Sequence, residues 1–177
     1  LPEGIYIGVL KRSSFDGVKI EERLIARAIA TCSGEILSPD KSMDLINMAR
    51  LYGYDWPEVR TITDRSGISD MLWECSDLIK IDYELDVQQK IAENNDRIEL
   101  QIASARGHLD RLVASQKSVI DRHRMAGGRD SLIKASEGKI DRLQKQFEVN
   151  LAKLNMKKQL KHRLDDVAYF VVNVGKE

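Results

Sequence analysis

Two long heptad patterns, separated by two adjacent glycines, constrain the fold of this chain more than any other feature. The first has polar interruptions at Asn95 and Gln116, and its apolar positions are Ile91, Ile98, Ile102, Ala105, Leu109, Leu112 and Val119. The second runs to about Leu164, through Ile133, Ser136, Ile140, Leu143, Phe147, Leu151 and Leu154. Spacings of three, four and seven residues are typical of helices that pack along a seam.

Each seam covers about 35 residues, or roughly 50 Å of helix at 1.5 Å per residue. A single such helix would leave its apolar stripe in water. We therefore predict that the two helices fold back on each other as an antiparallel hairpin, with Leu112 near Leu143 and Ile98 near Leu154. The tip of the hairpin is expected near residues 126–129.

The glycines Gly127 and Gly128 lie within the stretch RHRMAGGRDS. A phosphate-binding loop of the Walker type follows a strand and continues with Gly-Lys-Ser/Thr, whereas here a heptad helix precedes the glycines and Arg129-Asp130 follows them. The glycines therefore indicate a turn. Asp130 or Ser131 is expected to cap the second helix, and Glu137, together with Lys134 and Asp141, is expected to add charge pairing compatible with a helix.

The first segment, GIYIGVLKRS, alternates as a strand with one buried face, and SFDGVK turns the chain. The next stretch, ERLIARAIATCSGEIL, fits a helix or a strand, turn and strand, and we favour the second reading. A helix is expected from the N-cap Ser38 to Gly53, with an apolar stripe at Leu45, Ile46, Ala49 and Tyr52. The segment YDWPEVRTITDRS is expected to be a connector, because Pro57 excludes helix at Trp56.

The last segment, DDVAYFVVNVGKE, is rich in β-branched residues and predicts a strand that is central or buried on both faces. The predicted fold class is therefore α+β, a small mixed β-sheet with a short helix and a long antiparallel helical (coiled-coil) hairpin. We expect residues 1–177 to form one accessory domain. Residues 1–66 and 166–177 would form its sheet-containing base, and residues 67–165 its helical arm.

The charges are distributed unevenly. Lys and Arg number 28 in the whole chain, as do Asp and Glu, but residues 1–100 are acidic and residues 101–177 basic. This asymmetry indicates either an anionic partner for the second half or surfaces that neutralise each other. Cys32 and Cys75 have no second ligand at metal spacing, so we expect reduced packing residues in a cytoplasmic protein without zinc or cofactor. No apolar stretch is long enough for a membrane span.

One run of cations is a candidate nucleic-acid site: Lys153, Lys157, Lys158, Lys161 and Arg163. On a helix, several of these would share one face and could neutralise phosphates. The alternative is that they complement the helix dipole and keep the arm soluble. A second candidate is an interaction tip formed by Arg122, Arg124 and Arg129.

Catalytic groups are not indicated. His108, His123 and His162 are too far apart along a straight hairpin for a shared metal site, and His108 and His162 are expected to be solvated helix positions. Asp165-Asp166 is expected to be a polar boundary between helix and strand. The chain begins at Leu1, so we expect a longer parent protein whose catalytic parts lie upstream.

The stretch KIDRLQKQFEVNLAKLNMKKQLKHRLDDVAYFVVNV, a charged helix running into a valine-rich strand, resembles the C-terminal region of bacterial SWI/SNF-type (RapA-like) helicase-related ATPases. EERLIARAIA is also similar to that region. The resemblance implies a non-catalytic accessory domain of a DNA-dependent ATPase, whose arm contacts nucleic acid, RNA polymerase or the motor lobes. The alternative is a structural coiled-coil module that mediates protein association or homodimerisation without nucleic acid.

Overall fold

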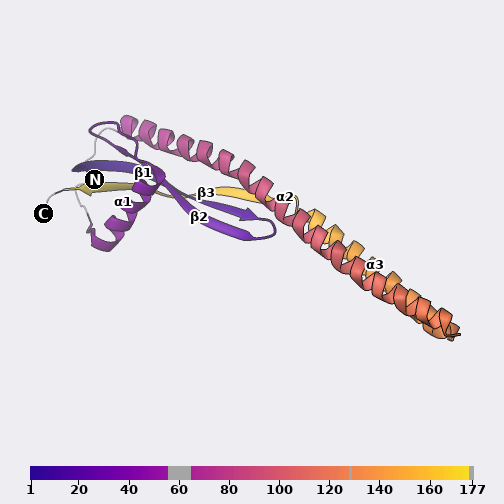
Figure 1. Cartoon of the computed structure of the whole chain (residues 1–177). Helices are drawn as coiled ribbons and strands as arrows, with labels where there is room; N and C mark the ends of the chain where they lie inside the picture. Colours follow the sequence, from indigo (N-terminus) through magenta and orange to yellow (C-terminus); the bar gives the residue numbers. More distant parts are fainter. Residues whose placement is uncertain (56–64, 128, 176–177) are drawn as a thin grey trace. The chain divides into compact units, whose positions relative to one another are not determined.

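The computed structural model describes residues 1–55, 65–127 and 129–175 (Figure 1). Along the chain the elements are β1 (Gly4–Asp16), β2 (Ile20–Ala30), α1 (Pro39–Tyr52), α2 (Arg65–Met125), α3 (Asp130–Met156) and β3 (Lys161–Val174). They form two compact units. The sheet unit comprises Leu1–Gln89 and Lys161–Glu177, and the helical unit comprises Lys90–Leu160, so α2 contributes to both.

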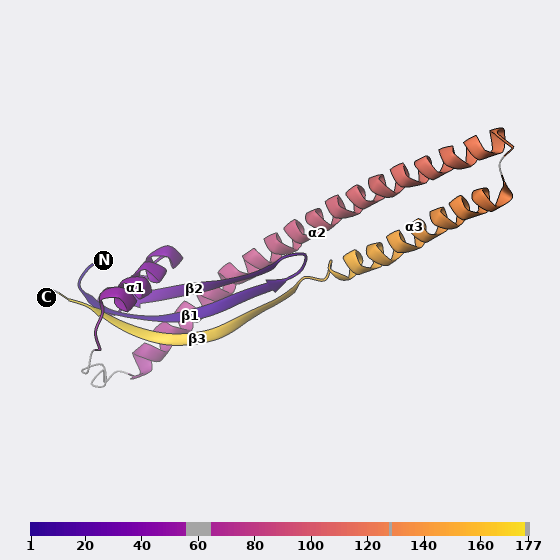
Figure 2. The same ribbon diagram turned by 90° about the horizontal axis from the view of Figure 1, so that it is seen from below.

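The sheet has three strands in the order β2-β1-β3 (Figure 2). Both pairings are antiparallel, so the expected mixed sheet is wrong, while the α+β class is confirmed. The reason is the chain path. A turn of residues 17–19 reverses β1 into β2, and β3 enters beside that turn, with Lys161 opposite Asp16. The strand expected in GIYIGVLKRS is confirmed, as is the first strand expected in ERLIARAIATCSGEIL. The second strand expected there, after the turn at Ser33 and Gly34, is wrong, because Ile36 forms only an isolated bridge with Ile29.

Strand β3 lies at an edge of the sheet, which corrects the prediction of a central or doubly buried strand. It pairs with β1 from Gly4 opposite Val174 to Asp16 opposite Lys161. A register shift between Leu10 and Lys11 leaves Val167 as an extra residue, a β-bulge. Val167 and Tyr169 are 50% and 63% exposed, because β-branched and aromatic residues favour strands whether or not both faces are covered.

The core lies on the two faces of the sheet, because alternate side chains point to opposite sides. On one face, Val9, Ile25 and Ile29 form a buried cluster with Cys75 and Ile79 of α2. On the other face lies a second cluster, whose buried members are Tyr6, Ala28, Ala30, Leu37 and Leu45. Burial of apolar surface stabilises a fold by about 25 cal/mol per Å², and these two layers contain most of the buried apolar side chains of this unit.

Helix α1 begins with the chemistry that its sequence predicts. The Ser38 side chain accepts a hydrogen bond from the Lys41 amide, Pro39 is the first helical residue, and Gly53 follows the last turn. Leu45 is buried against the sheet, but Tyr52 is 74% exposed, so its assignment to the apolar stripe is wrong. Tyr52 is the last residue of the helix, beyond the part that covers the sheet.

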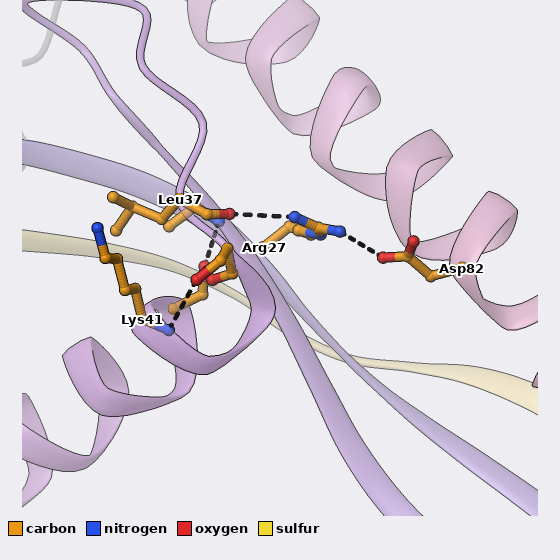
Figure 3. A network of polar contacts seen from close by, with 7 residues as sticks. Arg27, Leu37, Lys41 and Asp82 are labelled. Carbon is orange, nitrogen blue, oxygen red and sulfur yellow. Dashed lines mark hydrogen bonds and ion pairs between the residues drawn. The ribbon is translucent and has the colours of Figure 1, made fainter.

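Charged side chains attach α2 to β2 within the sheet unit. Arg27 donates one hydrogen bond to the carbonyl oxygen of Leu37, at 3.2 Å, and another to the Asp82 carboxylate (Figure 3). Arg23, on the same face of β2, pairs with Asp86, one helical turn further along α2. Only 16% of the Arg27 side chain is exposed, so removal of Asp82 would leave a largely buried charge with one hydrogen bond.

The returning helix ends earlier than its sequence suggests. α3 ends at Met156 and β3 begins at Lys161, whereas helix was expected to about Leu164 and an arm to residue 165. Pairing with β1 favours strand here, because β1 extends to Asp16 and offers a backbone partner to each residue from Lys161 to Val174 except at the bulge. Asp165 and Asp166 pair with Arg12 and Lys11, so they lie inside a strand and not at its boundary.

We predict that Gly8→Ala destabilises the sheet unit by about 1–3 kcal/mol, through steric overlap in a packed layer. A Cβ at Gly8 would lie 2.4 Å from the Phe170 ring and 2.4 Å from the Arg27 carbonyl oxygen. Chemical denaturation followed by circular dichroism measures the effect. Gly138→Ala is the matched control: its Cβ meets nothing within 4 Å, and alanine in a helix should be neutral or stabilising. Equal stability of both variants would contradict the prediction.

Candidate interaction surface on the helical unit

Within the helical unit, α3 runs antiparallel beside the second part of α2 (Figure 2). Near one end, the Asn94 side-chain amide donates to the Lys157 carbonyl oxygen at 2.8 Å. Near the other, Arg124 lies 3.5 Å from Glu137. Gly127 has φ +66° and forms the bend between the helices, as expected of a turn. Gly128 lies outside the described residues.

The burial of α3 follows the heptad pattern. Seven residues of α3 are half-buried, and all the remaining residues of the helix are exposed. The half-buried residues are Ile133, Ser136, Ile140, Leu143, Phe147, Leu151 and Leu154. The residues of the first seam are half-buried too, and Ile98 is fully buried, but Asn94 and Ile120, which the heptad pattern did not include, are also buried. Ile98 lies one turn from Asn94, and Leu154 lies one turn from Lys157. The expected neighbourhood of Ile98 and Leu154 agrees with this hydrogen bond.

The start of α3 differs from expectation in two details. Arg129 occupies the N-cap position without a side-chain hydrogen bond, and Asp130 is already helical, so capping by Asp130 or Ser131 is wrong. Glu137 pairs with Arg124 of α2 and not with Lys134. Glu137 lies beside the seam, where a side chain can reach across to the neighbouring helix as readily as along its own.

The predicted basic cluster is not a single helical face. Lys153 lies on α3, Lys157 and Lys158 follow the end of that helix, and Lys161 and Arg163 belong to β3 in the sheet unit. The helix was expected to continue through all five residues, and the change to strand separates them. Lys158 lies 4.0 Å from Glu99, and Arg163 is paired with Asp165, which reduces the positive charge that both residues offer.

The tip arginines Arg122, Arg124 and Arg129 are all exposed. Arg122 donates to the Ser118 carbonyl oxygen at 3.3 Å, and Arg124 pairs with Glu137. Among the described residues, Arg129 has no ion pair. The tip therefore offers a small positive surface, of which one cation is already neutralised.

The helical unit also carries a more continuous positive surface, which the sequence analysis did not predict. At 100° per residue, the seam of α3 occupies one side, an acidic row follows on its flank, and exposed cations fill the remaining side. The acidic row consists of Asp130, Glu137, Asp141 and Glu148. The cations, which we call the basic face of α3, are Lys134, Lys139, Arg142, Lys145 and Lys153.

The signal for this face was present in the sequence but distributed over 20 positions, so a search for consecutive cations missed it. Residues 90–160 contain fifteen Lys and Arg against nine Asp and Glu, a net charge of +6. The remainder of the chain therefore carries −6. Within the basic face, Lys145 forms an exposed pair with Asp141 at 2.9 Å, and such pairs contribute little to stability.

His162, expected to be a solvated helix position, lies on β3 instead. Its Nδ1 is 2.8 Å from the Tyr83 hydroxyl, and Phe15 stacks on the Tyr83 ring. Burial raises the pKa of Tyr83, and the carboxylates of Asp165 and Asp86 raise it further. This contact joins β3 to α2 within the sheet unit. Among residues 1–55, 65–127 and 129–175, no group of three potential metal ligands is found.

The two cysteines differ from each other. Cys75 is fully buried, and burial together with Glu74 raises the pKa of its thiol to about 11. Cys32 is exposed, which corrects its assignment as a packing residue. It lies in the turn after β2, outside the layers that cover the sheet.

Comparison with protein-family models, with curated proteins and with solved structures gives no match to this chain. In the part that the structure describes, no helix combines the length and the apolar character of a transmembrane segment. The function must therefore be argued from the surface of the chain itself.

We predict that Leu143→Asp unfolds the helical unit while the sheet unit stays folded, because a charge would enter the half-buried seam. Hydrogen exchange should be at least tenfold faster for amides within residues 130–156 and unchanged in β1 and β2. Gln144→Asp, at the adjacent exposed position, is the matched control and should leave exchange unchanged. Uniform protection in the Leu143 variant would contradict a packed seam.

A thiol reagent at pH 8 should label one cysteine of the native chain quickly and the second only after denaturation. Since the pKa of Cys75 is about 11, roughly a thousandth of this thiol is ionised at pH 8, and its burial blocks access as well. Absorbance of the released chromophore measures both phases. Cys32→Ser should remove the fast phase, and a fast phase that persists would show that Cys75 is accessible.

Proposed function

We propose that this chain is a non-catalytic accessory module whose helical unit is an antiparallel coiled-coil hairpin that binds the phosphate backbone of nucleic acid. The observation that carries the proposal is the basic face of α3. Its five cations are exposed on the side of the helix away from the seam. Cations arranged along one surface neutralise successive phosphates and provide sequence-independent affinity.

The coiled-coil geometry is supported by the alternation of burial along α3 and by the contacts near both ends of the helix pair. Half-buried residues recur at spacings of three and four, as knobs on a seam do. A hairpin of this kind has a thin core, so most of its side chains remain available for a partner. This suits a module that presents charge better than one that encloses a substrate.

The resemblance to the C-terminal region of RapA-like ATPases supports a specific context. In this proposal the chain lies C-terminal to a helicase-like, DNA-dependent motor in a cytoplasmic protein, and the motor supplies all ATP hydrolysis. The helical unit would add a second, salt-sensitive contact to DNA, or would contact RNA polymerase or the motor lobes. Lys157, Lys158 and the tip arginines would extend the basic face, whereas Lys161 and Arg163 lie in the other unit.

We expect weak DNA binding that falls steeply with salt, with a loss of at least tenfold in affinity for Arg142→Glu with Lys153→Glu. Each phosphate contact contributes about 0.9 to the slope of log K against log salt, so removal of two should lower its magnitude by about 1.8. Fluorescence anisotropy with a labelled duplex at several salt concentrations measures both quantities.

The matched control is Lys41→Glu with Arg50→Glu, which makes the same change in net charge at two exposed cations of α1 in the sheet unit. It should retain most of the affinity. An equal loss in the control would show that only net charge matters, and no binding by the unmodified chain would remove nucleic acid as the partner.

A further inference from the structure

The part of α2 in the sheet unit carries an exposed apolar surface. Trp73, Ile81 and Leu85 are 63%, 56% and 69% exposed, while Cys75 and Ile79 on the opposite side of the helix are buried against the sheet. Large apolar side chains grouped on one face of a surface helix are typical of an interaction site. In the described residues no element covers them.

The charges around this surface are almost all negative. Four exposed acidic residues share the face with the three apolar ones, and the single lysine among them, Lys80, is paired with Asp77 at 2.9 Å. We call the whole surface the acidic stripe; its members are Asp70, Trp73, Glu74, Asp77, Ile81, Glu84 and Leu85. A partner for the acidic stripe needs a helix with exposed apolar residues flanked by cations.

The basic face of α3 has this chemistry. Val149 and Met156 are 50% and 78% exposed and lie among Arg142, Lys145 and Lys153. The two surfaces also match in length: Asp70 to Leu85 and Arg142 to Met156 each span roughly 22 Å at 1.5 Å per residue. Exposed apolar residues beside cations would gain from burial and from charge pairing in the same contact.

The spacing of the charges matches as well. Glu74, Asp77 and Glu84 are separated by three and seven residues, and Arg142, Lys145 and Lys153 by three and eight. A parallel alignment of the two helices therefore brings Glu74 and Asp77 level with Arg142 and Lys145, and Glu84 within one residue of Lys153. The same alignment places Ile81 level with Val149, which puts an apolar contact between the charge pairs.

From these complementary surfaces we infer that the chain associates with a second copy of itself, the acidic stripe of one copy binding the basic face of α3 in the other. The net charges of +6 on residues 90–160 and −6 on the remainder favour this pairing over contact between like units. The inference goes beyond the proposed function and shares with it only the basic face. Nucleic acid and the second copy would compete for that face.

Sedimentation velocity of the whole chain over a range of concentrations tests the inference. We expect the mass to rise with concentration at low salt and to fall towards that of one chain at high salt. Glu74→Lys with Glu84→Lys, on the stripe, should weaken association at least tenfold, as should Arg142→Glu with Lys153→Glu, on the basic face. None of these four substituted residues forms an ion pair in the described structure.

The decisive experiment mixes the two charge-reversed variants. Each alone should remain a single chain, and the equimolar mixture should associate again, because the reversed charges are complementary. Recovery in the mixture also shows that both variants are folded. Trp73→Ser, which changes no charge, should weaken association in the same assay.

Glu22→Lys with Asp44→Lys is the matched control, since it reverses two exposed acids of the sheet unit outside the acidic stripe. It should associate like the unmodified chain. A single-chain mass at every concentration, or a mixture that fails to recover, would overturn the inference. The stripe variant should still bind DNA, at least as tightly as the unmodified chain, because its basic face is intact and free of the competing copy. Failure of self-association and failure of nucleic-acid binding are therefore distinguishable.

Discussion

The partial burial of the two seams, on helices that run side by side, is the constraint on which the rest of the helical unit depends. A third of the residues are charged, and neither α3 nor the second part of α2 has another apolar layer to cover it within the helical unit. In the helical unit the side chains that lose most of their contact with water are those of the seams, together with Asn94 and Ile120, and most of the others are free to carry charge. Because so few side chains of the helical unit are buried, the candidate functional surface lies on the outer side of a helix and not in a cavity.

Local signals predicted the parts of the fold that short-range chemistry determines. Ser38 and Pro39 predicted the start of α1, the alternation in residues 4–30 predicted two strands, and Gly127 predicted the bend. Heptad spacing predicted which residues of α3 would be half-buried. These features depend on neighbours within a few residues, so one sequence contains the information.

The conformation of residues 161–165 depends on pairing with a strand that is distant in the sequence, so local patterns could not predict it. Residues 161–165 continue a helical pattern by themselves, and their strand conformation depends on the free edge that β1 offers. The same applies to Lys161 and Arg163, which a helical reading grouped with Lys153 and which the fold separates. In contrast, the basic face of α3 and the acidic stripe of α2 follow from helical geometry once the ends of the helices are known.

The position of β1 has a consequence for how the chain folds. β1 is synthesised long before β3, yet one of its edges is completed by that distant strand, with Gly4 opposite Val174. Pairings so distant in sequence fold slowly, because the entropy of closing the intervening loop must be overcome first. During translation the β1–β2 hairpin would keep one edge with unpaired backbone groups until β3 had left the ribosome. Early formation of the local helical pair would shorten that wait by bringing the distant segments of the chain within reach of each other.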